Sequence, residues 1–215
     1  MSDKEKKPGI FYHGSYVKGL KTLQPYSKSH NTIKKPVIYL TPNETLSLFY
    51  IWKLIYKFVT FSEDENGVVI YKEWYNNQFE DFYEGLSGSV YECKDGPCIY
   101  GTHIAGVYNC DIPLDVSRET VIDDVCKEIK KRINDGSVIL QTYSSLSPED
   151  KEKIENDVVR SIHMQRLLNP GGSEYSTASA AFYREHFPVL WRRAEKMSED
   201  EIKAMYDEWK KSVGI

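Results

Sequence analysis

The chain has 215 residues, of which 40% are hydrophobic and 13% are aromatic, so it can bury a sizeable core as one domain or as a domain with a large extension. The formal net charge of −4 is shared evenly, because residues 1–115 carry 12 basic and 14 acidic side chains and residues 116–215 carry 16 and 18. This composition excludes a disordered chain and does not indicate a general nucleic-acid-binding protein.

The cysteines and the N-terminal segment limit the expected compartment and cofactors. The four cysteines are Cys93, Cys98, Cys110 and Cys126. They form no CxxC pair and lack suitably spaced histidines, so we expect no metal site. Residues 1–9 are charged, lack the apolar core of a signal peptide and predict a disordered, solvated tail. No apolar run approaches the roughly 18 residues of a membrane span. We therefore expect a cytoplasmic protein with reduced thiols and no membrane association.

The first predicted strand is short and is followed by a polar loop. Ile10–Tyr12 predicts a strand that ends at His13, and Gly14 permits a sharp turn or a close backbone approach. Residues 27–36 are polar and predict a mobile loop. Residues 1–35 contain eight lysines and two acids. Either a solvated tail and surface loop or the attraction of an anionic ligand explains this excess of positive charge.

A second strand and a helix come next. Val37–Leu40 is a β-branched and aromatic run, typical of a buried strand. Thr41 or Asn43 can cap a helix over residues 44–57, in which apolar side chains recur at helical spacing. We expect this helix to carry Tyr50 back toward the two strands.

The remainder of the first domain, residues 10–115, is predicted to be mostly β. Asn66-Gly67 is a strong hairpin signal between two β-rich runs. The predicted order is strand, strand, helix, strand, strand, over residues 57–62, 67–73, 76–84, 88–93 and 99–110.

The second domain, residues 116–215, is predicted to be a helical extension packed on the first. Beyond Pro113 the apolar residues recur with a period of 3.6. Ser147 and Ser198 provide helix-capping signals, and Pro170-Gly171-Gly172 provides a stop. Four helices are predicted, over residues 121–133, 147–168, 179–194 and 198–209.

A histidine motif and two tyrosines are the candidate functional residues. In His13-Gly14-Ser15, the imidazole and the adjoining backbone amide can face a ligand that approaches closely at the glycine. Tyr39 and Tyr50 are eleven positions apart, and they can face each other across a slot about as wide as a flat aromatic ring. Taken singly, each of these features is also typical of a structural residue.

The order and spacing of these residues resemble the ADP-ribosyltransferase fold, in the His-Tyr-Glu branch that contains diphtheria toxin and the poly-ADP-ribose polymerases. The resemblance covers Ile10–Tyr50 well, covers residues 57–111 only as an order of elements, and does not extend beyond Val116. It implies an α+β fold with a split antiparallel β core and short helices. It also implies that NAD is bound as a substrate, and that ADP-ribose is transferred to a protein, a nucleic acid or water.

The resemblance assigns roles to the individual residues of the motif. It implies that His13 binds the adenosine-side ribose of NAD and that the Gly14 backbone holds the carboxamide. Ser15 belongs to the same motif and is counted among the NAD-binding residues. Tyr39 and Tyr50 would enclose the nicotinamide ring between them.

The third motif of the family is a glutamate on a later strand, which stabilises the oxocarbenium-like transition state as nicotinamide leaves. Glu92 matches best, because it lies on a predicted strand after the hairpin and the helix. Glu73 and Glu84 compete with it, and each of the three can instead be a solvated edge residue. The sequence leaves open whether a catalytic glutamate is present.

The absence of early arginines separates two branches of the fold. No arginine precedes Arg118. The arginine-glutamate branch and the RNA 2′-phosphotransferases place an arginine in the early strands, and lysine cannot reproduce its bidentate fork. The sequence therefore favours the His-Tyr-Glu branch.

Three functions from different classes remain open. The first is an NAD-dependent ADP-ribosyltransferase, and the second is a module that binds a nucleotide or ADP-ribose without turnover. The third is an interaction protein whose helical half binds a partner through aromatic side chains that are also typical of a core: Trp191, Tyr206 and Trp209. The other histidines show no partner pattern and are expected to be structural: His30, His103, His163 and His186.

Overall fold

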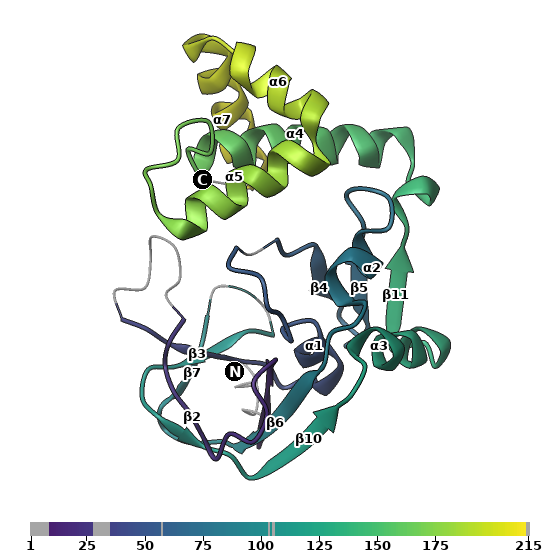
Figure 1. Ribbon diagram of the computed structural model, residues 1–215, viewed down its shortest axis with the longest axis vertical. Helices are drawn as coiled ribbons and strands as arrows, with labels where there is room; N and C mark the ends of the chain where they lie inside the picture. Colours follow the sequence, from purple (N-terminus) through teal and green to yellow (C-terminus); the bar gives the residue numbers. More distant parts are fainter. Residues whose placement is uncertain (1–8, 28–34, 57, 103, 105, 214–215) are drawn as a thin grey trace, which may run out of the picture. The chain divides into compact units, whose positions relative to one another are not determined.

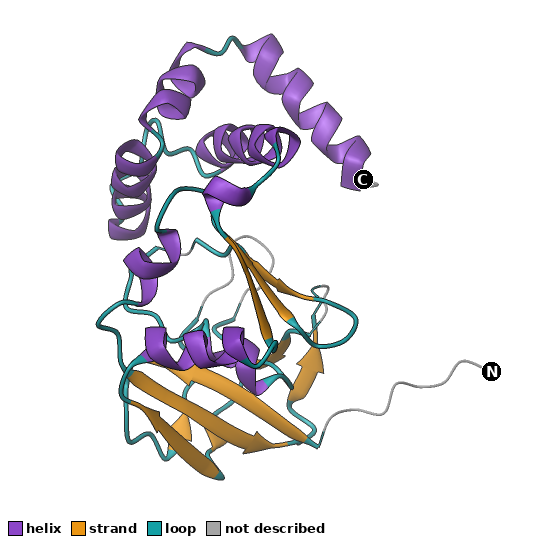
Figure 2. Ribbon diagram, turned by 90° about the vertical axis from the view of Figure 1, so that its right-hand side faces the viewer, coloured by secondary structure: helices purple, strands orange, loops and turns teal. Residues whose placement is uncertain are grey.

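The computed structural model describes residues 9–27, 35–56, 58–102, 104 and 106–213 (Figure 1). The predicted α+β class is confirmed, because the chain forms helices and mainly antiparallel sheets (Figure 2). The chain divides into two compact units. The β unit holds the described residues of Met1–Lys53, Thr60–Glu73 and Asn77–Gln141, and the helical unit holds those of Leu54–Val59, Trp74–Asn76 and Thr142–Ile215.

The helical unit begins later than the boundary predicted at residue 116. Strand β10 (Arg118–Ile122), helix α3 (Val125–Asn134) and strand β11 (Val138–Gln141) all belong to the β unit. The helical unit also includes two short segments from the first half of the chain, Leu54–Val59 and Trp74–Asn76. It is therefore assembled from three separate stretches of sequence.

The central sheet is antiparallel, and its middle strand is β6 (Gly88–Lys94), between β1 (Ile10–Ser15) and β10. Side chains alternate between its two faces. One face packs in a core with the helices of the β unit, which includes Leu46, Phe49, Phe79, Val90, Ile122, Val125 and Ile129. The other face packs in a second core, which includes Phe11, Leu23, Ile38, Leu40, Tyr91, Cys93 and Cys110.

A second sheet is joined to the first by a backbone bridge. It contains β3 (Ile38–Leu40), β8 (Tyr108–Cys110) and β7 (Ile99–Gly101), in that order. The Tyr12 N–H donates to the Thr41 carbonyl at 2.7 Å, and the Thr41 N–H donates to the Tyr12 carbonyl at 3.0 Å. This isolated bridge connects β1 with the end of β3.

The remaining strands form two small sheets. The predicted hairpin is confirmed, with β4 (Phe61–Glu63) antiparallel to β5 (Val69–Lys72), and β5 is also parallel to β11. Strands β2 (Thr22–Leu23) and β9 (Leu114–Asp115) form an antiparallel pair. The predicted strand over residues 99–110 is two strands, β7 and β8, which pair with each other.

Helix α1 (Glu44–Leu48) is shorter than predicted. Asn43 caps it, as expected, because its Oδ1 accepts a hydrogen bond from the Leu46 N–H at 3.2 Å. Phe49 and Ile51 are both fully buried. A continuing helix would point these two side chains about 200° apart, so the chain turns instead and places Tyr50 just beyond the helix.

Two predicted helices have different bounds in the structure. Val121 and Ile122 lie in β10, and α3 begins only after Asp124, whose Oδ1 accepts from the Lys127 N–H at 2.8 Å. The predicted helix over residues 179–194 is divided into α5 (Glu174–His186) and α6 (Pro188–Lys196). Proline at the first position of α6 cannot continue the preceding helix.

The helical unit contains α4 (Pro148–Met164), α5, α6 and α7 (Glu199–Val213). The predicted caps at Ser147 and Ser198 are confirmed, since their hydroxyls accept from the N–H groups of Asp150 at 3.0 Å and Glu201 at 3.3 Å. A cluster of aromatic rings joins the short segments from the first half of the chain to α5: Tyr56, Phe58, Trp74, Phe182, Tyr183 and Phe187.

Helix α2 (Gln78–Tyr83) confirms the helix predicted over residues 76–84. Several predictions concern positions outside the described residues: most of the tail, residues 28–34 of the polar loop, Lys57, His30 and His103. Within the described part of the chain, no helix is long and apolar enough to cross a membrane. All four cysteines are free.

The packing of Gly14 against α1 generates a stability prediction. A Cβ at Gly14 would lie 2.0 Å from the Ser47 carbonyl oxygen and 3.1 Å from the Ile51 nitrogen, and both are backbone atoms that cannot turn aside. We expect Gly14→Ala to lower the free energy of unfolding by about 1–3 kcal/mol or more, as measured by urea denaturation. Gly9→Ala is the control, because nothing lies within 4 Å of its added Cβ. Equal unfolding midpoints for the two variants would contradict this account of Gly14.

Candidate functional site

His13 connects the two sheets through its side chain. Its Nδ1 lies 2.8 Å from the Tyr39 carbonyl oxygen. Because a carbonyl only accepts hydrogen bonds, Nδ1 must carry the proton, and Nε2 is left as an acceptor. Burial lowers the pKa of His13, and the hydrogen bond to the Tyr39 backbone opposes that shift only in part. His13 is therefore a neutral imidazole near pH 7, with an acceptor nitrogen that a ligand hydroxyl can use.

The backbone of Gly14 faces the gap between β1 and β3. Tyr12 directs its N–H and carbonyl at Thr41, and backbone direction alternates along a strand, so Gly14 directs its own groups toward Tyr39. In a continued ladder the Tyr39 carbonyl would accept from Gly14, but it accepts from His13 instead. One donor and one acceptor side by side match the hydrogen-bonding groups of a carboxamide.

The two tyrosines of the motif lie near this gap. Tyr39 is half-buried on β3, next to the carbonyl that His13 holds. Tyr50 follows α1 and packs edge-on against Phe61, with ring centroids 5.3 Å apart. Burial raises the pKa of Tyr50 to about 12, and the nearby Tyr39 adds to the effect, so the Tyr50 hydroxyl stays neutral. The structure thus places Tyr50 near Gly14 and Tyr39, but Tyr50 packs with Tyr12 against the core on the face of the central sheet opposite to the His13 side chain.

Ser15 has a local structural role at the end of β1. Its Oγ accepts a hydrogen bond from the Val17 N–H at 3.1 Å, which stabilises the turn after the strand. Its side chain shares a face of the sheet with that of His13, because the two residues are two positions apart. Ser15 is therefore next to the candidate site.

Glu92 lies on the opposite face of the central sheet from His13. The register pairs Glu92 with Tyr12 and pairs His13 with Tyr91, and adjacent side chains along a strand point to opposite faces. The Glu92 carboxylate is held by Arg118, at 2.8 Å from Nη2 and 3.1 Å from Nε. The structure therefore does not bring Glu92 to His13.

The two competing glutamates are also placed away from His13. Glu73 is 3% exposed, and its Oε1 accepts a hydrogen bond from the Phe79 N–H at 3.0 Å. It thereby satisfies an N–H of the first turn of α2, which is a structural role. Glu84 is exposed at the C-terminal end of the same helix.

A fourth glutamate, Glu119 on β10, shares the face of His13. The register aligns His13, Tyr91 and Glu119 across the three strands, which places the outer two roughly 10 Å apart by the interstrand spacing. Glu119 Oε1 accepts from the Gly19 N–H at 2.7 Å and from the Ser89 hydroxyl at 2.7 Å. These bonds lower the pKa of Glu119, which is therefore ionised near neutral pH.

Sequence reasoning missed Glu119 because residues beyond Val116 were assigned to the helical extension. The β-branched run Thr120-Val121-Ile122 is a strand signal for β10, but Val121 and Ile122 also fit a helical period. Even then, the face on which Glu119 points depends on the register with β6, which the sequence does not state.

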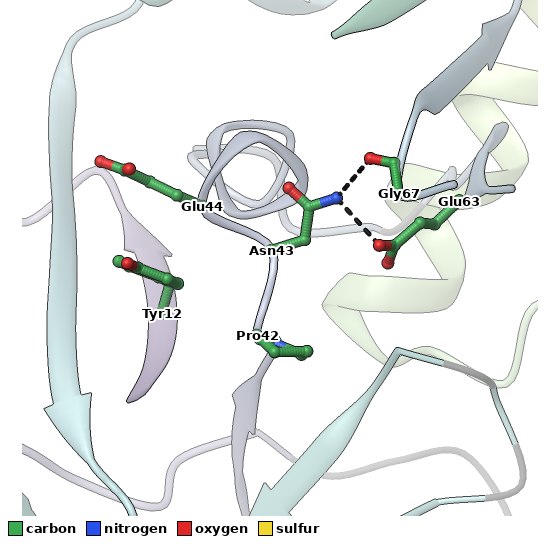
Figure 3. A pocket seen from close by; sticks show the side chains of 6 residues that line it. All are labelled: Tyr12, Pro42, Asn43, Glu44, Glu63 and Gly67. Atoms are coloured by element: carbon green, nitrogen blue, oxygen red, sulfur yellow. Dashed lines mark hydrogen bonds between the residues drawn. The ribbon is translucent and has the colours of Figure 1, made fainter. Parts of the chain in front are cut away.

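An open cavity of about 480 Å³ lies next to Tyr12, and Figure 3 shows its lining residues: Tyr12, Pro42, Asn43, Glu44, Glu63 and Gly67. Asn43 Nδ2 donates to the Glu63 carboxylate at 3.0 Å and to the Gly67 carbonyl at 2.8 Å, so it joins the hairpin loop to the start of α1 (Figure 3). Two carboxylates line the cavity. They would repel the pyrophosphate of a dinucleotide, so this cavity is a poor site for NAD.

A second cavity, of about 360 Å³, lies within the helical unit. Its walls are mostly aromatic and apolar, and they include Trp74, Tyr75, Tyr143, Ile154, His186 and Phe187. His186 stacks on Tyr75 with ring centroids 4.3 Å apart, which is a packing role. Trp191 is 3% exposed, so it belongs to the core, and Tyr206 and Trp209 are half-buried. Of these three residues only Trp191 is a core residue, and Tyr206 and Trp209 keep part of their surface exposed.

Within the described ranges, no three histidine, cysteine, aspartate or glutamate side chains are grouped so that they could hold a metal ion. Burial raises the pKa of Cys93 to about 12 and that of Cys110 to about 11, so both thiols are protonated near neutral pH.

The lowered pKa of His13 predicts a pH dependence of stability. The folded state favours the neutral imidazole, so below the unfolded pKa of about 6.5 the unfolded chain binds more protons and stability falls as the pH falls. We expect the urea midpoint to drop between pH 6.5 and 5. His13→Asn, whose amide can still donate to Tyr39, should show a smaller drop.

His163 in α4 also has a pKa lowered by burial, so His163→Asn is the matched control. Following the unfolding of the β unit separates the two effects, because His163 lies in the helical unit. An unchanged pH dependence in His13→Asn would show that His13 is not the titrating group.

Comparisons with known proteins identify no relative of this chain. No family model matches it, and no curated protein or solved structure does. The functional argument therefore depends on the residues and their geometry.

Proposed function

We propose that the β unit binds NAD and transfers its ADP-ribose group, as an ADP-ribosyltransferase of the His-Tyr-Glu type. The observation that carries the proposal is the gap between β1 and β3, where His13 replaces Gly14 as the donor to the Tyr39 carbonyl. The Gly14 N–H, which points toward β3, is therefore not bonded to the Tyr39 carbonyl and can donate to a ligand beside Tyr39. A flat ring with a carboxamide fits those groups, and nicotinamide is such a ring.

The proposed reaction breaks the bond between nicotinamide and the ribose carbon. The bonding electron pair goes to the pyridinium nitrogen, which becomes neutral, and positive charge develops on the ribose. An acceptor nucleophile then bonds to the ribose carbon and loses its proton. A carboxylate that stabilises the developing charge lowers the barrier. Glu119 replaces Glu92 in our proposal, because it is ionised and shares the face of His13.

Binding without turnover is the second candidate function, and one observation favours it. Tyr91 lies between His13 and Glu119 in the sheet and is fully buried. Its hydroxyl donates to the Val17 carbonyl at 2.7 Å, so the chain after β1 covers the space between the two residues. If that cover stays in place, Glu119 does not reach a ligand at His13, and the site binds NAD only.

Release of nicotinamide from NAD by the purified protein tests the first function. We expect Glu119→Gln to slow release by about 10²-fold or more, because a neutral amide cannot stabilise positive charge as a carboxylate does. Glu92→Gln is the matched control, since it changes the same group on the opposite face of the sheet. We expect it to change the rate by less than about threefold.

The two candidate functions give different outcomes in this assay. No release by the wild-type protein, together with an NAD-dependent rise in Tm, would favour binding without turnover. Equal loss in both glutamate variants, or loss only in Glu92→Gln, would refute the assignment of Glu119. The absence of both release and binding would refute the NAD site itself.

Substitution of Tyr50 tests the nicotinamide slot. Tyr50→Phe keeps the ring, whereas Tyr50→Leu keeps apolar volume without a π-face. Aromatic contacts contribute about 0.5–1.5 kcal/mol, so we expect Tyr50→Leu to weaken NAD binding by about 2- to 10-fold relative to Tyr50→Phe, as measured by calorimetry. Tyr26, which is 82% exposed, provides a control in Tyr26→Leu. Equal affinity of the two Tyr50 variants would show that this ring does not contact the ligand.

A further inference from the structure

Asn109 has a buried side-chain oxygen without a partner. The residue is 2% exposed on β8, the middle strand of the second sheet, and among the described residues none donates to its Oδ1. Buried polar atoms nearly always have a hydrogen-bond partner, because removing an amide oxygen from water without replacement is unfavourable. An unpaired acceptor at the centre of a sheet therefore requires an explanation.

The register places Asn109 beside the candidate site. It is directly opposite Tyr39 on β3 and directly opposite Tyr100 on β7. Side chains that are directly opposite in an antiparallel pair share a face and lie roughly 5 Å apart at Cβ. The neighbours of Tyr39 along β3, Ile38 and Leu40, point the other way into the second core. Asn109 is thus the next side chain to Tyr39 across the sheet, on the face away from that core.

We propose that Asn109 Oδ1 accepts a hydrogen bond from the carboxamide N–H of nicotinamide bound beside Tyr39. This inference rests on the proposed NAD site. The –NH₂ of the carboxamide is the one donor group on the ring, and it carries two hydrogens. The Gly14 carbonyl can take one and Asn109 the other. A turn about the Cβ–Cγ bond, whose torsional preference is broad, directs Oδ1 at the ligand.

The arrangement selects the amide form of the dinucleotide over the acid form. A nicotinic acid ring would present carboxylate lone pairs to the Gly14 carbonyl, and two acceptors repel, whereas the Asn109 amide can turn to present either Oδ1 or Nδ2. A site built to bond a donor rejects the analogue that lacks it, because its own buried polar groups are then left unpaired. Asn109 is therefore a binding residue for the nicotinamide end of NAD, and the Gly14 carbonyl supplies the preference for the amide.

Calorimetric titration of the full chain with three probes tests the proposal: NAD, its nicotinic acid analogue and ADP-ribose. We expect Asn109→Leu to weaken NAD binding about tenfold or more. ADP-ribose lacks the ring, so its affinity should not change. The Tm of the free protein should stay the same or rise, because the variant removes an unpaired buried polar group.

Two further variants keep the test decisive. Ser179→Ala removes a different buried polar group without a described partner, a hydroxyl in the helical unit, and should leave all three affinities unchanged. If Asn109→Leu does not fold, Asn109→Ser replaces it and is expected to show the same selective loss for NAD.

Each remaining outcome overturns the proposal in a recognisable way. Unchanged NAD affinity in the Asn109 variants would show that Oδ1 does not contact the ligand, although the NAD site would stand. Equal weakening of NAD and ADP-ribose, or a Tm lowered by several degrees, would assign Asn109 a structural role. If the wild-type protein binds neither NAD nor ADP-ribose, the NAD site fails, and this inference fails with it.

Discussion

The hydrogen bond from His13 to the Tyr39 carbonyl is the constraint on which the candidate site depends. It holds β1 and β3 together one residue past their backbone bridge, yet it occupies the carbonyl that would otherwise continue the ladder. The two strands therefore stay adjacent without closing. The same bond fixes the tautomer of His13, so a single contact determines the shape of the gap and the chemistry of the imidazole that borders it.

The alternation of side chains along β1 separates two chemical environments. Tyr12 points to a face where Glu44, Glu63 and Glu92 gather, and that face repels anions. His13 points to the other face, where the nearest carboxylate in the register is already engaged by the Gly19 N–H and the Ser89 hydroxyl. The carboxylates on the Tyr12 side therefore disfavour an anionic ligand on that face of the strand.

Sequence signals within a few residues of each other predicted much of the fold, and the pairing of distant strands determined the rest. The caps at Asn43, Ser147 and Ser198 were predictable because each uses a side chain within three residues of the group it satisfies. The face of Glu92 was not predictable, because it depends on register with a strand about 80 positions away. The run ending in Val121-Ile122 fits a helical period and a β-branched strand equally well, and pairing with β6 favoured the strand.

The path of the chain between the two units limits how the protein can be divided. Phe58 and Trp74 come from segments that interrupt the β unit, and their rings lie in the helical unit, where Phe58 contacts Phe182 on α5. A fragment ending at Gln141 would keep these side chains and lose the helices that bury them. Truncation at this point would therefore expose an apolar aromatic surface instead of yielding a separately folded domain. The two units thus have to be produced as one chain.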